Sequence, residues 1–238
     1  MTEWDCIVVG GGAAGLSAGL VLGRARRKTL IVDAEEQSNL AAAGIGGVLG
    51  NDTRPPAEFY AAGREELRRY PTVELHRGEV AGGRRDEDGF TLTLADGSEE
   101  HARRVLLATG MDYRIPDRPG FAEHGGGSVL HCPFCHGWEN RDRPLGVLGR
   151  GGSLLLRAWS DDVTLFTDGA LELSPSERER LHAAGVTIED RPVAAVHGQD
   201  GALTHVELDD GSLRACQGLL VPVALHQRRA HRARLLSP

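Results

Sequence analysis

The sequence predicts an α/β protein made of two doubly wound, three-layer domains. Three observations predict this class. A glycine-rich loop joins a short apolar strand to an apolar helix at residues 10–15. The order of strand, glycine loop and strand returns from residue 145 onward. Both halves also end in the same order of an acidic turn and a short apolar strand.

The composition is compatible with such a protein. The chain has 238 residues, of which 40% are hydrophobic and 26% charged, so it can bury one large or two modest cores. The net charge of −7 argues against a nucleic-acid or anionic-membrane partner. Four cysteines in a chain of this length do not make a disulfide scaffold. We therefore expect a soluble, cytoplasmic enzyme.

The run Cys6–Gly23 carries no charge, and its length raises the possibility of a membrane helix or signal peptide. Two features argue against it. Glu3 and Asp5 precede the run, where a signal peptide carries Lys or Arg, and the run contains six glycines, which are unfavourable in an uninterrupted helix. We interpret the run as a strand, a loop and a helix.

The first of these elements is a short β-branched strand at residues 5–9, and Leu16–Leu22 follows the glycine loop as the helix. In the loop, Gly10 permits a tight turn, Gly12 lets a pyrophosphate approach the backbone, and Gly15 lets helix and strand pack closely. This context predicts a dinucleotide-binding, Rossmann-like unit.

The second strand, Thr29–Asp33, places an acidic residue where it can accept hydrogen bonds from ribose hydroxyls. Pro55-Pro56 predicts a helix that runs to about Tyr70. Further strands are expected at Val73–His76 and Phe90–Leu94. Residues 105–110 predict a buried strand that ends in the small-residue loop Ala108-Thr109-Gly110.

The second half repeats this order. Residues 145–149 read as a strand that enters a glycine loop, and Val163–Phe166 is its partner strand. Ser174 to Glu177 is a capping box with proline at the first helical position, and Gly185 ends that helix. Residues 219–221 fall where 105–107 do, at a spacing of 114 residues. This pattern indicates a diverged internal duplication.

The second unit is not a faithful copy of the first. Its glycine loop and second strand are 17 residues apart (Gly149 to Phe166) instead of 22 (Gly10 to Val32), which removes about 7.5 Å of helix. The remaining helix, residues 153–159, is therefore short. Leu154 stands where a small residue should allow close packing, and no arginine pair follows Phe166. We interpret this as a degraded nicotinamide site, so NAD(P)H is a doubtful cofactor.

A Cys-x-x-Cys pair, Cys132 and Cys135, lies between the two units. It is a redox dithiol, half of a zinc site, or structural. Zinc requires four ligands, and the other two cysteines lie singly in strand-like segments, so we expect no metal and favour the redox dithiol. His136 is placed to shuttle a proton; its alternative is a surface histidine.

These motifs resemble the low-molecular-weight, thioredoxin-reductase-like flavoproteins of the pyridine nucleotide-disulfide oxidoreductase family, over nearly the whole chain. The segment Cys-Pro-Phe-Cys-His-Gly-Trp-Glu at 132–139 is most similar to the branch of gliotoxin- and holomycin-type dithiol oxidases. Those enzymes carry tyrosine where Phe134 stands, and true thioredoxin reductases usually carry aspartate where His136 stands.

The resemblance implies roles for the cysteines. Cys135 would face the flavin of FAD and Cys132 would meet the substrate, a small-molecule dithiol whose electrons pass to FAD and then to oxygen, giving hydrogen peroxide. It also implies a homodimer. The residues that it assigns to FAD are Gly10, Gly12, Ala13, Ala14, Gly15, Asp33, Ala34, Asn39, Val80, Ala108, Thr109 and Gly110.

The resemblance further implies that the second domain is inserted in the first, with an FAD-binding domain at 1–113, its return-segment remnant at 223–238, and an NAD(P)-binding-like domain at 117–220. The family's closing segment, which ends in Gly-Asp, has no counterpart before Pro238, and the last residues form a basic tail. We therefore expect an FAD site that is open on one side. Two other hypotheses are an NAD(P)H-dependent disulfide reductase and a truncated, non-catalytic homologue that at most binds a nucleotide.

Overall fold

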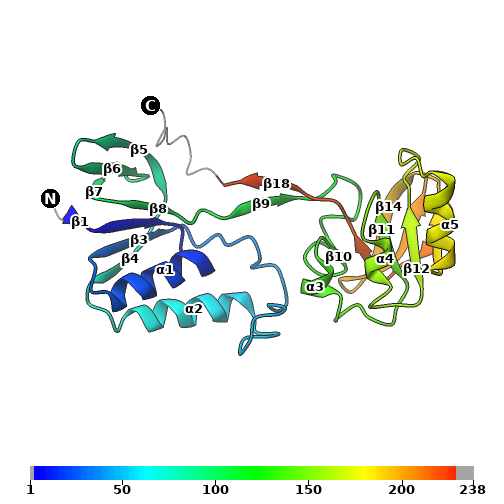
Figure 1. Cartoon of the computed structure of the whole chain (residues 1–238), viewed down its shortest axis with the longest axis horizontal. Helices are drawn as coiled ribbons and strands as arrows, with labels where there is room; N and C mark the ends of the chain where they lie inside the picture. Colours follow the sequence, from blue (N-terminus) through cyan, green and yellow to red (C-terminus); the bar gives the residue numbers. More distant parts are fainter. Residues whose placement is uncertain (1–2, 229–238) are drawn as a thin grey trace. The chain divides into compact units, whose positions relative to one another are not determined.

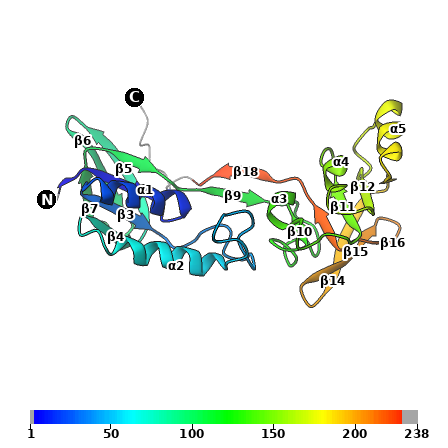
Figure 2. The ribbon, with the colours of Figure 1, turned by 60° about the horizontal axis from the view of Figure 1, so that its bottom comes forward.

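The computed structural model describes residues 3–228, and the chain forms two compact units (Figures 1 and 2). Unit 1 contains the residues up to 40, residues 54–112 and the chain from 225, whereas unit 2 contains 41–53 and 113–224. The second unit is therefore an insertion in the first. Segment 41–53 belongs to unit 2, in contrast to the boundary expected at residue 113. The expected return segment is described only as far as residue 228.

Unit 1 is built on a parallel sheet in the order β4-β3-β2-β8, made of Val73–Arg77, Thr29–Asp33, Cys6–Val9 and Val105–Leu107. The helices α1 (Ala13–Arg24) and α2 (Pro56–Leu67) cover one face of this sheet (Figure 1). On that face Val8 and Ile31 pack with Leu16 and Leu67. Because successive strand residues point to opposite faces, the neighbouring residues pack on the other side.

That other face is covered by a second sheet in the order β1-β7-β6-β5, made of Glu3–Trp4, Glu99–Ala102, Gly89–Leu94 and Val80–Asp86. Ile7, Val9 and Leu30 of the parallel sheet pack there with Leu92 and Leu94. Unit 1 thus has three layers, and its glycine loop lies at the carboxyl end of β2.

Unit 2 repeats this plan. Its parallel sheet has the order β10-β17-β11-β12-β13, made of Val129–Leu130, Gly218–Leu220, Leu145–Leu148, Val163–Phe166 and Val186–Glu189. The helices α4 (Ser153–Leu156) and α5 (Pro175–Ala183) pack on one face.

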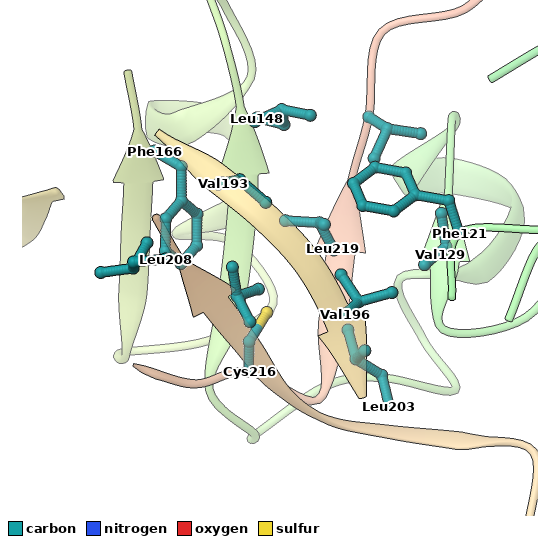
Figure 3. Packing of buried hydrophobic residues seen from close by; sticks show 12 residues of the cluster. Phe121, Val129, Leu148, Phe166, Val193, Val196, Leu203, Leu208, Cys216 and Leu219 are labelled. Carbon is teal, nitrogen blue, oxygen red and sulfur yellow. The ribbon is translucent and has the colours of Figure 1, made fainter. Parts of the chain in front are cut away.

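The other face of this sheet packs against β14 (Val193–Gln199), β15 (Ala202–Leu208) and β16 (Leu213–Ala215). Figure 3 shows Val193 and Val196 of β14 beside Phe166 and Leu219 of the parallel sheet. The remaining elements are the single-turn helix α3 (Pro133–His136) and the pair β9 (Met111–Arg114) and β18 (Ala224–Gln227), where the chain passes between the units. The shared plan of the two units agrees with the predicted α/β duplication.

Two sequence predictions are corrected by the structure. Strand β8 is not buried: Leu106 is 37% and Leu107 is 44% exposed. The reason is that β8 is an edge strand, paired with β2 alone among the described strands, whereas its counterpart β17 lies between β10 and β11 and buries Leu219. The helix expected at 153–159 is also shorter, since α4 ends at Leu156.

The uncharged run at 6–23 forms β2, the glycine loop and most of α1. Among the helices of residues 3–228, none combines the length and the apolar character that a bilayer crossing requires.

Candidate functional site

The cysteine pair is presented by α3, a single helical turn in unit 2. Cys132 is the residue that caps the turn and Pro133 opens it, so that the backbone N–H of Cys135 donates to the Cys132 carbonyl oxygen at 3.2 Å. This spacing places both side chains on one side of the turn. The Sγ atom of Cys135 lies 2.7 Å from the Sγ atom of Cys132, and both thiols are partly exposed. A disulfide can therefore form with little movement of the backbone.

The two thiols differ in their surroundings. Burial, together with the hydrogen bond to Cys132, raises the pKa of Cys135 to about 12. Thiol–disulfide exchange requires a thiolate, so Cys135 needs a base before it can act as a nucleophile.

Two imidazoles flank the pair. His136 follows Cys135 directly, and both of its ring nitrogens are buried without a hydrogen-bond partner in the described part of the chain. Buried polar groups of this kind normally have a partner, so the two unpaired ring nitrogens of His136 are an exception among buried polar groups. His131 stacks on Tyr113 with ring centroids 4.7 Å apart, and burial followed by the charge of His136 lowers the pKa of His131.

The segment 41–53 lies against the backbone of this turn. A side chain at Gly46 would clash with the carbonyl oxygen of Cys135, so glycine lets the two backbones approach closely. The segment therefore belongs to the surroundings of the cysteine pair, a role that nothing in its own sequence pattern predicted.

The glycine loop of unit 1 has the geometry of a nucleotide cradle. Gly10 has a φ of +106°, and a side chain on Gly15 would clash with the Gly10 carbonyl oxygen, so both positions require glycine for the fold of the loop itself. A Cβ atom on Gly12, in contrast, would meet nothing nearer than the Cγ of Gln37 at 3.8 Å. Gly12 therefore keeps space open at the N-terminus of α1.

The N-terminus of α1 also favours an anion. Gly12 caps this twelve-residue helix without a side-chain hydrogen bond, and its first turn, which begins with Ala13 and Ala14, holds no acidic residue. The free N–H groups and the positive end of the helix dipole suit a phosphate. On these observations the loop fits the pyrophosphate of a dinucleotide.

Asp33 ends β3 beside this loop and is held in place by several donors. Its carboxylate accepts hydrogen bonds from Arg64 of α2 at 2.7 Å and from the backbone N–H of Glu35 at 2.9 Å. The side-chain amide of Gln37 donates to Asp33 at 3.1 Å and to the Gly11 carbonyl oxygen at 3.3 Å. Gln37 also donates to the second Asp33 oxygen, at 3.4 Å, so four hydrogen bonds meet the roughly four acceptor sites of the carboxylate, and a ribose hydroxyl would have to replace one of these donors.

The other residues assigned to FAD are all in unit 1. Ala34 is exposed, and Asn39 accepts a hydrogen bond from the Tyr60 hydroxyl at 2.8 Å. The Val80 side chain is buried in the core at 1% exposure, and its backbone pairs with Leu94 in the β5–β6 ladder. The loop that contains Ala108, Thr109 and Gly110 follows the exposed strand β8, and the backbone N–H of Arg228 donates to the Gly110 carbonyl oxygen at 3.1 Å.

Unit 2 lacks an acid at the position equivalent to Asp33. The last strand pairs, Val9 with Val32 and Leu148 with Phe166, place Thr167 where unit 1 has Asp33. The Thr167 hydroxyl is buried and donates to Asp190 at 3.0 Å. No carboxylate is therefore presented at this position for a ribose.

The neighbouring acid, Asp168, is also engaged. Arg118 donates to both of its oxygens, at 2.8 and 2.6 Å, and the Val193 backbone N–H donates at 2.8 Å. Burial alone would raise the pKa of Asp168, but these hydrogen bonds outweigh it and hold the pKa below its usual value. The pair with Arg118 thus fixes Asp168 as a structural group.

Sequence reasoning did not identify Gln37, Arg64, Arg118 or Gly46. Each of them contacts a residue that is distant in the chain, and a local sequence pattern cannot predict such a contact. Among residues 3–228, no group of three or more His, Cys, Asp or Glu side chains is arranged to hold a metal ion.

Comparison with known proteins places this geometry in a family. The family model described as pyridine nucleotide-disulphide oxidoreductase matches residues 4–228. The chain is 35% identical over 235 residues to thioredoxin reductase aclD of Aspergillus oryzae, covering 92% of this chain and 74% of that protein. It is 33% identical over 226 residues to thioredoxin reductase tcpT of Claviceps purpurea, covering 87% and 70% of the two chains.

Solved structures agree with these relatives. The crystal structure of HlmI matches with a TM-score of 0.88 and 40% identity, covering 94% of this chain and 72% of that one. The putative thioredoxin reductase TrxB of Bacillus anthracis matches with a TM-score of 0.89 and 30% identity, covering 98% and 78%.

Proposed function

The chain belongs to the pyridine nucleotide-disulphide oxidoreductase family, and from this premise we propose that it is an FAD-dependent enzyme that oxidises a small-molecule dithiol to a disulfide with oxygen as the electron acceptor. The observation that carries this proposal is the pair Cys132 and Cys135, whose sulfur atoms lie 2.7 Å apart on one helical turn. Such a pair can alternate between dithiol and disulfide.

Unit 1 supports the choice of cofactor. The open space at Gly12 would take the FAD pyrophosphate and Asp33 the ribose, with the further contacts at Ala34, Asn39, the Val80 backbone and residues 108–110. Bound FAD supplies a two-electron acceptor that oxygen can reoxidise. We assign 1–113, without segment 41–53, together with 223–238 to the FAD-binding domain, and 117–220 to the NAD(P)-binding-like domain. By family likeness, the protein is a cytoplasmic homodimer.

The cysteines perform the exchange with the substrate. One substrate thiolate attacks Cys132 of the disulfide, which forms a mixed disulfide and releases Cys135 as a thiol. The second substrate thiol then displaces Cys132, so the product leaves as a disulfide and both cysteines are reduced. His136 takes and returns the protons. Over one cycle the substrate dithiol and oxygen give the substrate disulfide and hydrogen peroxide.

The second unit supports oxygen rather than a nicotinamide as the partner of this cycle. Thr167 stands at the position of the ribose-binding acid, and α4 has only four residues. A nicotinamide dinucleotide would lack both the acid and the long helix that bind it in a Rossmann unit.

A second candidate function follows from the names of the relatives, several of which are thioredoxin reductases. In that case the chain is an NAD(P)H-dependent disulfide reductase, and electrons run in the opposite direction through the same cysteines. A truncated homologue that at most binds a nucleotide is the third.

Anaerobic addition of reductants to the purified protein separates the three functions. We expect the purified protein to be yellow, and its flavin absorbance to be bleached by dithiothreitol but not by NADPH or NADH. In air, the protein should consume oxygen and form one hydrogen peroxide per dithiol oxidised.

Cys132→Ser and Cys135→Ser should abolish dithiol turnover, whereas the control variant Cys6→Ala, in strand β2, should retain it. Rapid bleaching by either nucleotide would establish the reductase instead, and protein that is colourless and takes up no FAD would establish the non-catalytic homologue.

A further inference from the structure

Two aromatic side chains are exposed beside the cysteine pair. Phe134, between the two cysteines, is 71% exposed, and Trp138, one turn further along the chain, is 65% exposed. Large apolar side chains grouped on a surface mark a binding site more often than isolated ones do. We call these two residues the aromatic surface.

Both rings are held in place by neighbours. The Phe134 ring meets the ring of the partly buried Trp159 edge-on, with centroids 5.4 Å apart. The Arg141 guanidinium lies 3.8 Å from the centre of the Trp138 ring and donates to the Trp138 carbonyl oxygen at 2.6 Å. Rings that are fixed before binding lose little conformational entropy when a ligand covers them.

The size of the aromatic surface indicates its occupant. An aromatic side chain buries roughly 150–250 Å², so these two, at their exposed fractions, offer roughly 200–350 Å². A stable protein–protein interface requires about 800 Å² on each partner. The aromatic surface is therefore too small to anchor a protein by itself, but it matches one face of a small molecule.

Resting on the dithiol oxidation proposed above, we propose that the aromatic surface binds the substrate, and that the substrate is a small dithiol with a flat, apolar and preferably aromatic frame. Stacking on Phe134 and Trp138 would hold such a frame next to Cys132, where the exchange begins.

The test compares an aromatic with an aliphatic dithiol. For benzene-1,2-dimethanethiol and dithiothreitol, kcat/KM is measured by oxygen consumption in the holoenzyme. We expect the ratio of the two constants to fall about tenfold in Trp138→Ala and Phe134→Ala, mainly through KM, and to recover in Trp138→Phe. Leu213→Ala removes a similarly exposed side chain from β16, 52% exposed, and should leave the ratio unchanged.

A second measurement does not depend on turnover. The S,S′-dimethyl derivative of benzene-1,2-dimethanethiol cannot exchange with a disulfide, and its binding is measured by calorimetry. We expect binding to the wild-type protein and about tenfold weaker binding to Trp138→Ala. If the wild-type protein oxidises neither dithiol, the proposed function has failed, and this titration alone decides whether the aromatic surface binds its ligand.

Three results would overturn the inference. The first is a ratio of constants that is the same in Trp138→Ala and the wild-type protein. The second is a thioether derivative that does not bind, or binds the variants equally well. The third is a reduced thioredoxin that is oxidised faster than the aromatic dithiol and depends on Trp138, since the aromatic surface would then serve a protein.

Discussion

At the scale of single residues, Cys132 and Cys135 share one helical turn but differ in reactivity. Burial is the main reason that the pKa of Cys135 is raised to about 12, so at neutral pH this sulfur is a thiol. Cys132, which caps the turn, receives the S–H hydrogen bond of Cys135. The geometry therefore favours Cys132 as the sulfur that reacts with molecules from outside.

Alkylation of the reduced protein tests this difference. With iodoacetamide at pH 7.5, we expect Cys132 to be labelled at least about tenfold faster than Cys135, because the thiolate is the reactive form. Mass spectrometry of the peptides after short reaction times gives both rates. Cys6 and Cys216 are buried internal controls that should stay unlabelled while the protein is folded. Equal labelling of Cys132 and Cys135 would contradict the assignment.

At the scale of elements, the sequence predicted those whose signals are local. The start of α5 is an example, since the predicted capping box of Ser174 and Glu177 is present and Gly185, with a φ of +74°, follows the helix. Strand β3 likewise has the predicted bounds. The glycine loop and the cysteine pair were equally visible, because their spacing is fixed by neighbouring residues.

Elements that depend on distant neighbours were predicted less well. The composition of Val105–Leu107 is that of a buried strand, and the two exposed leucines result from the missing second neighbour of β8. The contacts of Arg64 with Asp33 and of Arg118 with Asp168 cross 31 and 50 residues of chain. No periodicity within one element could indicate them.

The end of β13 shows how such distant contacts stabilise an element. Glu189 is 8% exposed and accepts hydrogen bonds from Arg191 at 2.6 and 2.8 Å and from Arg214 of β16 at 2.9 Å. The hydrogen bonds from Arg191 are the largest cause that lowers its pKa to about 2, against the opposing effect of burial.

This shift predicts how stability depends on pH. Because the folded-state pKa of Glu189 is below the unfolded value of about 4.3, its contribution is complete above that pH and is lost as the pH falls toward 2. Glu189→Gln should therefore lower the free energy of unfolding by about 1–3 kcal/mol at pH 7 and by less at pH 3. Urea denaturation at both pH values measures the difference. The exposed Glu179→Gln serves as control and should change stability by less than about 0.5 kcal/mol. A loss that is the same at both pH values would show that the ionisation of Glu189 makes no contribution to stability.

At the scale of the whole molecule, the same three-layer plan occurs twice with opposite outcomes. In unit 1 the loop keeps open space at Gly12 and an acid at Asp33. In unit 2 the position that corresponds to Asp33 is taken by Thr167, whose hydroxyl donates to Asp190. A duplicated fold can thus keep its layers while the acid after the second strand is present in only one copy, because layer packing and ligand contacts depend on different residues.

This asymmetry predicts that the two units respond differently to nucleotides. In calorimetric unfolding of the full chain, FAD at 100 times its Kd should stabilise the transition of unit 1 by about 2.7 kcal/mol, whereas NADPH should shift neither transition.

The variant Gly12→Val tests whether FAD binds at this loop. Gly12 has an extended backbone with a φ of −76° and free space around its Cβ position, so valine can be accommodated by the apoprotein while it fills the space for the pyrophosphate. We expect Gly12→Val to unfold like the wild-type protein without FAD and to gain no stability when FAD is added. Gly82→Val, also in unit 1 and with free space at its Cβ position, should keep the full response. If Gly12→Val were stabilised as strongly as Gly82→Val, the nucleotide would bind elsewhere in the molecule.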